Sequence, residues 1–165
     1  MTRRRLTVLV ASATALGLVA LWRIATGDDR RLDGQVRQAL ERYEQAFARD
    51  GARATPTPAR RDGFAPVLGA PSVEKVTVLR DGGTLTAEFI GGRATGPCGS
   101  DYTARAVESE HAVLIVIEEH PHWRVRACTS EGHLRQATVR LSRPLDGRTV
   151  LEAMRGMPVT VEPAG

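Results

Sequence analysis

The sequence lacks the motifs that mark the common classes of enzyme. It contains no G-x-S-x-G nucleophile elbow, and the glycines Gly91, Gly92 and Gly96 precede no helical pattern that could bind a phosphate group. Ser100 beside Asp101 is an ordinary loop composition, and no pair of carboxylates stands out as the acid and base of a glycosidase. These absences favour a protein without catalytic activity, and we expect no cofactor.

The sequence also lacks a basic surplus outside its N-terminus. It has 23 Lys and Arg against 19 Asp and Glu, and four of the arginines flank the first apolar segment. The 19 basic side chains that remain from Asp28 onward balance the 19 acidic ones. A folded part with no net charge offers no field to attract phosphate, so we expect no nucleic-acid partner.

Long apolar runs are scarce, and the longest is N-terminal. Leu6–Trp22 carries no charge and follows three arginines, Arg3–Arg5. This pattern predicts a signal anchor over residues 1–27, with a short cytoplasmic tail and the rest of the chain outside the cell membrane as a single-pass protein. A cleaved signal peptide and a buried helix are the alternatives, because 17 residues is short for a span of about 30 Å.

The next segment, residues 28–53, has the pattern of one amphipathic helix. Its apolar residues fall at i, i+4, i+7 and i+11, and they are Val36, Leu40, Tyr43 and Phe47. Asp33 is the expected N-cap and Gly51 the expected end. We expect the apolar face to pack on the domain that follows, although a homodimer through the 36–47 face is an alternative. Prolines and Gly63 make residues 54–72 a linker or a loop against the domain edge.

From Val73 to the C-terminus the apolar period changes to two, which predicts an exported β-rich domain over residues 73–165. Ala112–Ile117 is its most apolar run and is expected to be the central strand, buried on both faces. Asp81-Gly82-Gly83 predicts a hairpin turn. Further strands are expected near 73–78, 84–89, 102–107, 123–128, 137–142, 149–151 and 159–161. The fold class is therefore α+β, mostly β, with a small antiparallel sheet, sandwich or open barrel.

The two cysteines, Cys98 and Cys128, lie on either side of the central strand. On the exported side of a membrane they predict one disulfide bond. A shared metal ion or a redox pair is the alternative, but no Cys-x-x-Cys motif is present.

One part of the chain resembles proteins already known. A strand is followed by Arg143–Arg148 (Arg-Pro-Leu-Asp-Gly-Arg), a second strand, Gly156 and a Pro-Val pair, and the Gly-Pro-Cys-Gly sequence surrounds Cys98. Together these features resemble membrane-anchored or secreted proteins of GC-rich Gram-positive bacteria, over roughly residues 82–161. The resemblance implies a location in the cell envelope, and it implies no catalytic residue.

The densest group of possible metal ligands is Glu118, His120 and His122. On a strand these three side chains share one face, and imidazole and carboxylate groups suit zinc. Pro121 indicates a turn, however, which would spoil that alternation. The other interpretation is a solvated strand end whose charges prevent aggregation.

The glycine-rich loop 91–100 is the best candidate for a recognition surface, with a simple disulfide-tethered connection as the alternative. We expect Trp123 to be a core anchor. The sequence thus predicts a membrane-anchored extracytoplasmic module that binds an envelope protein or a wall component without catalysis. The alternative is a metal-binding protein or metal-dependent hydrolase that uses Glu118, His120 and His122.

Overall fold

The computed structural model describes residues 31–58, 70–122, 128–129 and 131–165. No helix among these residues is long and apolar enough to cross a membrane. The predicted anchor over residues 1–27 lies outside the described residues, as do residues 123–127 of the strand predicted there. Residues Gln35 to Gly165 form one compact unit, so the amphipathic helix folds together with the β region.

The predicted helix is present over residues 31–50. It ends at Gly51, whose φ of +59° suits a residue without a side chain, and a 3-10 turn, η1 (Gly51–Arg53), follows. Asp33 lies inside the helix, so its prediction as the N-cap is wrong, because a capping residue has a non-helical backbone. Beyond η1, residues 54–58 have no regular structure, but Ala54 and Pro56 are buried, so this part of the predicted linker packs against the domain.

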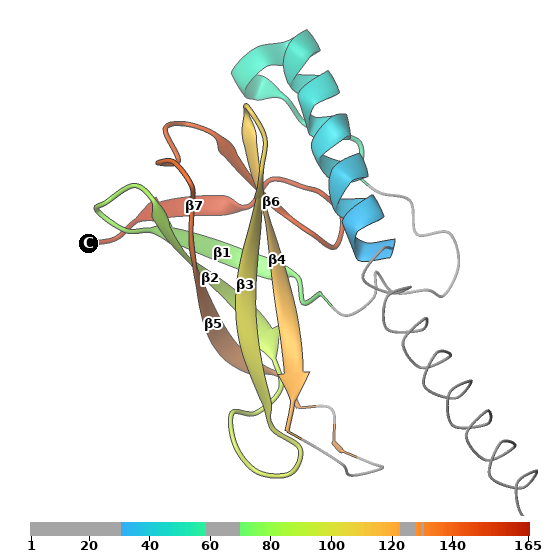
Figure 1. Ribbon diagram of the computed structural model, residues 1–165, viewed down its shortest axis with the longest axis vertical. Coiled ribbons are helices and arrows are strands. Elements are labelled where there is room, and N and C mark those ends of the chain that lie inside the picture. Colours follow the sequence, from blue (N-terminus) through green and yellow to red (C-terminus); the bar gives the residue numbers. More distant parts are fainter. Residues whose placement is uncertain (1–30, 59–69, 123–127, 130) are drawn as a thin grey trace, which may run out of the picture. The chain divides into compact units, whose positions relative to one another are not determined.

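Among the described residues, seven strands form two sheets (Figure 1). The four-stranded sheet has the order β5-β2-β1-β7, and the three-stranded sheet has the order β3-β4-β6. The strands are β1 (Val73–Val78), β2 (Thr84–Gly91), β3 (Ser100–Glu108), β4 (Ala112–Pro121), β5 (His133–Arg140), β6 (Thr149–Glu152) and β7 (Thr160–Pro163). The hairpin predicted at Asp81 joins β1 to β2, where Asp81 Oδ1 accepts hydrogen bonds from the backbone of Gly83 and Thr84.

The predicted antiparallel pairing holds for β1–β2, β2–β5 and β3–β4, but both sheets are mixed. β1 pairs with β7 in parallel, and β4 pairs with β6 in parallel. A parallel pair needs a long connection, which sequence reasoning assigns to a helix. Here strands of the opposite sheet form that connection: the chain leaves β4, passes through β5 in the other sheet and returns as β6.

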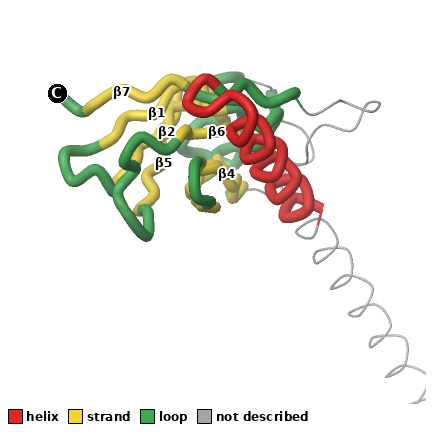
Figure 2. The backbone as a smooth tube through the Cα atoms, turned by 90° about the horizontal axis from the view of Figure 1, so that it is seen from above, coloured by secondary structure: helices red, strands yellow, loops and turns green. Residues whose placement is uncertain are grey.

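The central strand β4 is buried on both faces between Ala112 and Ile117, as predicted. Val113, Ile115 and Ile117 point into the core between the sheets, where Leu85 and Phe89 of β2 also lie. The alternate residues point the other way, and the helix 31–50 lies on that side of the sheet (Figure 2). The order of layers is therefore helix, three-stranded sheet and four-stranded sheet.

Specific contacts hold the helix in place. Tyr43 is buried and donates a hydrogen bond from its hydroxyl to Thr149 Oγ1 on β6 at 2.6 Å. Gly156 approaches the helix so closely that a Cβ there would lie 2.8 Å from Cβ of Ala39. The apolar face considered for a homodimer is thus covered by the chain's own sheet, and a second copy would have to displace it.

The segment Arg143–Arg148 is held by a buried ion pair. Arg148 is 7 % exposed, and its Nη1 lies 2.7 Å from Glu108 Oε2. Its Nη2 donates to the carbonyl oxygens of Arg143 and Pro144 at 2.9 Å each. This part of the resembling sequence therefore serves to fix a loop.

The edges of the two sheets meet. β3 and β5 lie next to each other at one side. At the other side, the backbone N–H of Val159 donates to the carbonyl of Val150 at 2.9 Å, which joins β6 to the residues before β7. Edges that cover each other in this way offer little to a foreign strand.

Candidate functional site

The candidate recognition surface lies at the end toward which β4 points (Figure 1). We call it the distal end, and it comprises the β2–β3 loop 92–99, the last residues of β4, and residues 128–129 and 131–134. Cys98 and Cys128 form the predicted disulfide bond, with their Cα atoms 5.7 Å apart. The bond ties the β2–β3 loop to the connection between β4 and β5.

The side chain of Tyr102 holds the base of this loop. Its hydroxyl accepts a hydrogen bond from the backbone N–H of Gly92 at 2.6 Å and donates to Glu119 Oε1 at 3.1 Å. Its ring meets Phe89 edge-on, with the centroids 5.0 Å apart. A Cβ on Gly91 would lie 2.8 Å from Cζ of Tyr102, so only glycine fits there. Burial raises the pKa of Tyr102, so the hydroxyl stays protonated and can donate.

Arg135 of β5 adds a second support. Its guanidinium lies 5.0 Å from the ring centroid of Tyr102, and it donates to the carbonyl oxygens of Gly92 at 2.8 Å and Ser100 at 3.2 Å. The hydroxyl of Ser100 in turn donates to Glu119 Oε1 at 2.6 Å. The base of the loop is thus fixed by three strands, while residues 93–97 at its tip are exposed.

An exposed apolar pair lies beside this loop. Ile90 and Leu134 face each other across β2 and β5 and are 51 % and 65 % exposed. Gly132 packs against Ile90, since a Cβ there would lie 2.7 Å from Ile90 Cγ2. An ion pair between Arg93 and Glu131 spans the same region. Ile90 and Leu134 therefore form a small exposed apolar area with charged side chains beside it.

Glu118 and His120 lie on the outer face of the distal half of β4, and His122 directly follows the strand. Each of these three candidate metal ligands lies beside a different side chain. Their partners on β3 are as follows: Glu118 contacts Arg105 at 3.1 Å, His120 contacts Thr103 at 2.9 Å, and His122 contacts Asp101 at 2.8 Å. β4 continues through Pro121, so the expected turn is absent and the alternation is kept. In the described part of the chain, no three His, Cys, Asp or Glu side chains converge as metal ligands.

The Asp101–His122 pair has the chemistry of two members of a catalytic triad. Ser100 is not the third member, because it precedes Asp101 on β3 and its hydroxyl points to the opposite side, toward Glu119. A nucleophile must lie within hydrogen-bond reach of its base, so these residues do not form a triad.

The other two histidines lie apart from this group. His133 is 3.6 Å from Glu131. His111, in the β3–β4 turn, stacks on Phe47 with the ring centroids 3.9 Å apart, and its Nδ1 lies 2.7 Å from Glu44 Oε2. Burial alone raises the pKa of Glu44, but hydrogen bonds from Ser109 and His111 outweigh it, and the pKa is lowered. This contact links the helix to the turn.

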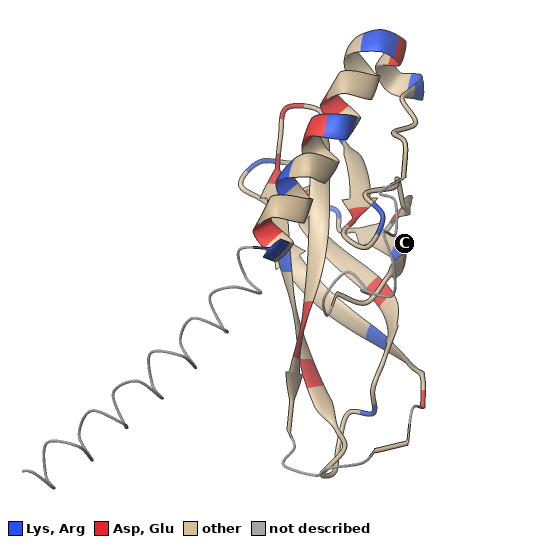
Figure 3. Cartoon of the chain, turned by 90° about the vertical axis from the view of Figure 1, so that its right-hand side faces the viewer, with Lys and Arg blue, Asp and Glu red and all other residues tan. Residues whose placement is uncertain are grey.

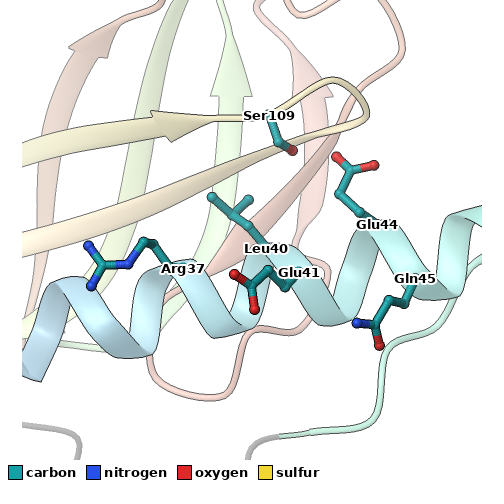
Figure 4. Close-up of a pocket in the computed structure, with 6 residues that line it drawn as sticks. All are labelled: Arg37, Leu40, Glu41, Glu44, Gln45 and Ser109. Atoms are coloured by element: carbon teal, nitrogen blue, oxygen red, sulfur yellow. The ribbon is translucent and has the colours of Figure 1, made fainter.

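An open groove of about 430 Å³ runs beside that contact (Figure 4). It is lined by Arg37, Leu40, Glu41, Glu44, Gln45 and Ser109. In the close-up, Leu40 and Glu44 point from the helix toward the turn that carries Ser109. Figure 3 shows acidic and basic side chains interspersed along the helix. The rim of the groove therefore carries charged side chains of both signs.

Sequence reasoning missed the residues that build the distal end. Tyr102, Glu119 and Arg135 belong to three strands, and Asp101 meets His122 only through the register of β3 and β4. A usable signal was the run of polar residues after the apolar part of β4, which marks the point where one face of the strand is uncovered. The comparisons with known proteins add nothing to this picture: no protein family, curated protein or solved structure was found that matches the chain.

Proposed function

We propose that this chain is a non-enzymatic binding module, held at the extracytoplasmic face of the cell membrane by its N-terminal segment, and that its distal end recognises a protein partner. The observation that carries the proposal is the exposed loop tip 93–97 on a fixed base, beside the exposed pair Ile90 and Leu134. Rigid support reduces the ordering cost of binding, and apolar side chains supply contact energy.

The aromatic side chains favour a protein over a wall polysaccharide as the partner. Sugar rings are commonly held by stacking on an exposed aromatic ring. Within the described ranges, Tyr43, Phe47, Phe89 and Tyr102 are all buried or half-buried. The large exposed apolar side chains in the described part of the distal end are Ile90 and Leu134, and both are aliphatic, which suits contacts with another protein.

The location rests on the sequence of residues 1–27 and on the disulfide bond. A basic cluster before an apolar run directs a chain to the membrane, and disulfides form in oxidising compartments. The metal-dependent hydrolase has less support, because Arg105 engages the carboxylate of Glu118 and no three candidate ligands converge in the described part of the chain. The resemblance to envelope proteins is compatible with the binding module.

Photo-crosslinking in the producing cells tests the recognition surface. A photoreactive amino acid at Thr95, in the loop tip, should give a covalent adduct with one partner, and the same group at Gln38 on the exposed helix face should not. Ile90→Ser combined with Leu134→Ser should abolish the adduct. Leu79→Ser, which removes an exposed apolar side chain elsewhere, is the matched control and should leave it intact. An adduct that persists in the double variant argues against the proposal.

Mass spectrometry of the protein from its native membrane tests the location. We expect an intact N-terminus and no alkylated cysteine under denaturing, non-reducing conditions. A truncated N-terminus would indicate a secreted protein, and two alkylated thiols would place the domain in a reducing compartment.

A further inference from the structure

One pair of side chains at the distal end acts on the β2–β3 loop without belonging to its exposed tip. We propose that Asp101 and His122 are positioning residues, which hold this loop in the conformation that the partner recognises. The inference rests on the proposed function, and it names two residues that recognition requires in addition to the contact surface. It also gives a role to the Gly-Pro-Cys-Gly sequence around Cys98.

The Gly-Pro-Cys-Gly sequence, residues 96–99, forms a tight turn in the loop. The N–H of Gly99 donates to the carbonyl oxygen of Gly96 at 3.0 Å, which closes a β-turn with Pro97 and Cys98 at its centre. Proline suits the second position of such a turn because its ring fixes φ. The turn therefore has a defined conformation that a neighbouring side chain can hold in place.

His122 packs against this turn. Its backbone N–H donates to the carbonyl oxygen of Gly99 at 2.9 Å. A Cβ on Gly99 would lie 2.9 Å from Nδ1 of His122 and 2.9 Å from the carbonyl carbon of Thr95. The imidazole ring and the backbone of Thr95 thus occupy the space beside Gly99, and a side chain there would have to displace one of them. His122 therefore limits where the turn can lie.

Asp101 fixes the orientation of the imidazole ring. Its Oδ2 lies 2.8 Å from Nε2 of His122. A carboxylate only accepts hydrogen bonds, so Nε2 is the donor, and Nδ1 is the ring nitrogen that faces Gly99. Asp101 belongs to β3 and His122 directly follows β4, so the pairing of these two strands brings the side chains together. The contacts thus run from the two strands, through the pair, to the turn.

The effect of the pair is local. The side chains of Asp101 and His122 are 73 % and 33 % exposed, and such a pair adds little to the stability of a whole domain. The disulfide bond holds the turn at Cys98, and His122 holds it at Gly99. A loop that already has its binding conformation loses less freedom when it binds, so the pair raises affinity without contacting the partner.

Hydrogen exchange of the oxidised full chain at constant pH, followed by NMR, tests the positioning role without a partner. Asp101→Ala and His122→Ala should each make exchange of the Gly99 N–H at least about threefold faster, because its hydrogen bond opens more often. Asp101→Asn should behave like the wild type, because its amide oxygen still accepts a hydrogen bond from Nε2. His120→Ala is the matched control, since His120 contacts Thr103 and not the loop, and it should leave exchange unchanged.

Photo-crosslinking from Thr95 in the producing cells measures recognition itself. The yield of adduct should fall in Asp101→Ala and return in Asp101→Asn, and urea midpoints should be the same in both variants. An adduct that Asp101→Ala leaves intact, but that is lost when Ile90 and Leu134 are replaced, supports the proposed function and overturns this inference. Exchange at Gly99 that is equal in Asp101→Ala and the wild type also overturns it. A wild-type chain that gives no adduct overturns the proposed function, and the inference falls with it.

Discussion

The two halves of strand β4 differ in what covers them. Both pair with β3 in one continuous register. From Ala112 to Ile117 the core covers one face and the helix covers the other, and every residue is buried. From Glu118 to Pro121 the outer face carries hydrogen-bonding side chains and is open to solvent. The same backbone thus serves as core at one end and as surface at the other.

This comparison shows that the reach of the helix decides which outer-face residues of β4 are buried and which are exposed. Where the helix lies over the sheet, a side chain on the outer face is selected for packing. Beyond it, the outer-face side chains are exposed to solvent, while the base of the loop is still fixed by Tyr102 and Arg135 from the inner side. The predictions below test whether the two halves respond as differently as their surroundings imply.

The largest effect is expected in the covered half. Leu114→Ala should lower the free energy of unfolding by about 2–5 kcal/mol, because it leaves a cavity beneath the helix. Urea denaturation followed by circular dichroism measures this loss. Glu118→Ala, four residues further along the same strand, is the control and should change stability by less than about 0.5 kcal/mol. Equal losses would contradict the division of the strand.

The stability of the distal end should depend on the Cys98–Cys128 disulfide bond. Replacing Cys98 and Cys128 together by serine should lower the free energy of unfolding by about 3–4 kcal/mol, the chain-entropy value for a loop of this length. Hydrogen exchange should also become faster in the loop 92–99 than in β4. If hydrogen exchange becomes faster to the same degree in the loop 92–99 and in β4, the disulfide bond stabilises the whole domain. That result would contradict the division between the covered and the distal parts.

Acid should weaken the contacts around the β3–β4 turn. Hydrogen bonds hold the pKa values of Glu44 and Glu108 below their ordinary value of 4.5, despite the opposing effect of burial. A carboxyl with a lowered pKa in the folded state contributes stability above its unfolded pKa and loses it as the pH falls through the folded one. Stability should therefore decline as the pH drops below about 4.5.

The variant that isolates this effect is Glu44→Gln. The substitution should lower the free energy of unfolding by about 1–2 kcal/mol at neutral pH, as expected for hydrogen bonds to a charged group at a half-exposed site. It should also make the loss of stability at low pH smaller. Glu41→Gln, on the exposed side of the same helix, should leave the decline unchanged. Urea midpoints at pH 7 and pH 4 measure the loss of stability at neutral pH and its further decline in acid. If the decline between pH 7 and pH 4 is the same in Glu44→Gln as in the wild type, Glu44 does not cause the acid sensitivity.

The smallest effect concerns a single hydrogen bond between the helix and β6. Tyr43→Phe should cost about 1 kcal/mol, because Thr149 Oγ1 loses its donor while the ring still fills its place. Thermal unfolding measures the shift. A larger loss, approaching that of Leu114→Ala, would show that this bond positions the helix instead of merely supporting it.

Much of the fold follows from local patterns in the sequence. The apolar run Ala112–Ile117 indicated the central strand, Asp81-Gly82-Gly83 indicated the first hairpin, and the context of Cys98 and Cys128 indicated their bond. The strand and hairpin signals each lie within a few neighbouring residues, and a pair of cysteines has few alternatives to a disulfide bond. The helix was also found, although Asp33 proved to lie inside it.

What the sequence did not reveal depends on distant parts of the chain. The parallel pairing of β1 with β7 joins residues separated by nearly the whole domain, and no local pattern encodes it. β5 begins at His133, before its alternating apolar pattern starts, because β2 offers it partners as far as Gly91. The meeting of Asp101 with His122 likewise follows from strand register, which the sequence of one strand leaves open.

The late pairing of β1 with β7 also sets an order of assembly. The β3–β4 hairpin and the Cys98–Cys128 bond need only residues up to 128, so they can form while later residues are still being synthesised or exported. The four-stranded sheet gains its last strand, and β4 its second neighbour, only when residues 149–163 arrive. Such non-local pairing folds slowly. The distal end, whose supports Tyr102, Glu119 and Arg135 all precede residue 149, can therefore take shape first, and the rest of the domain would stay exposed to chaperones and proteases until β7 pairs with β1.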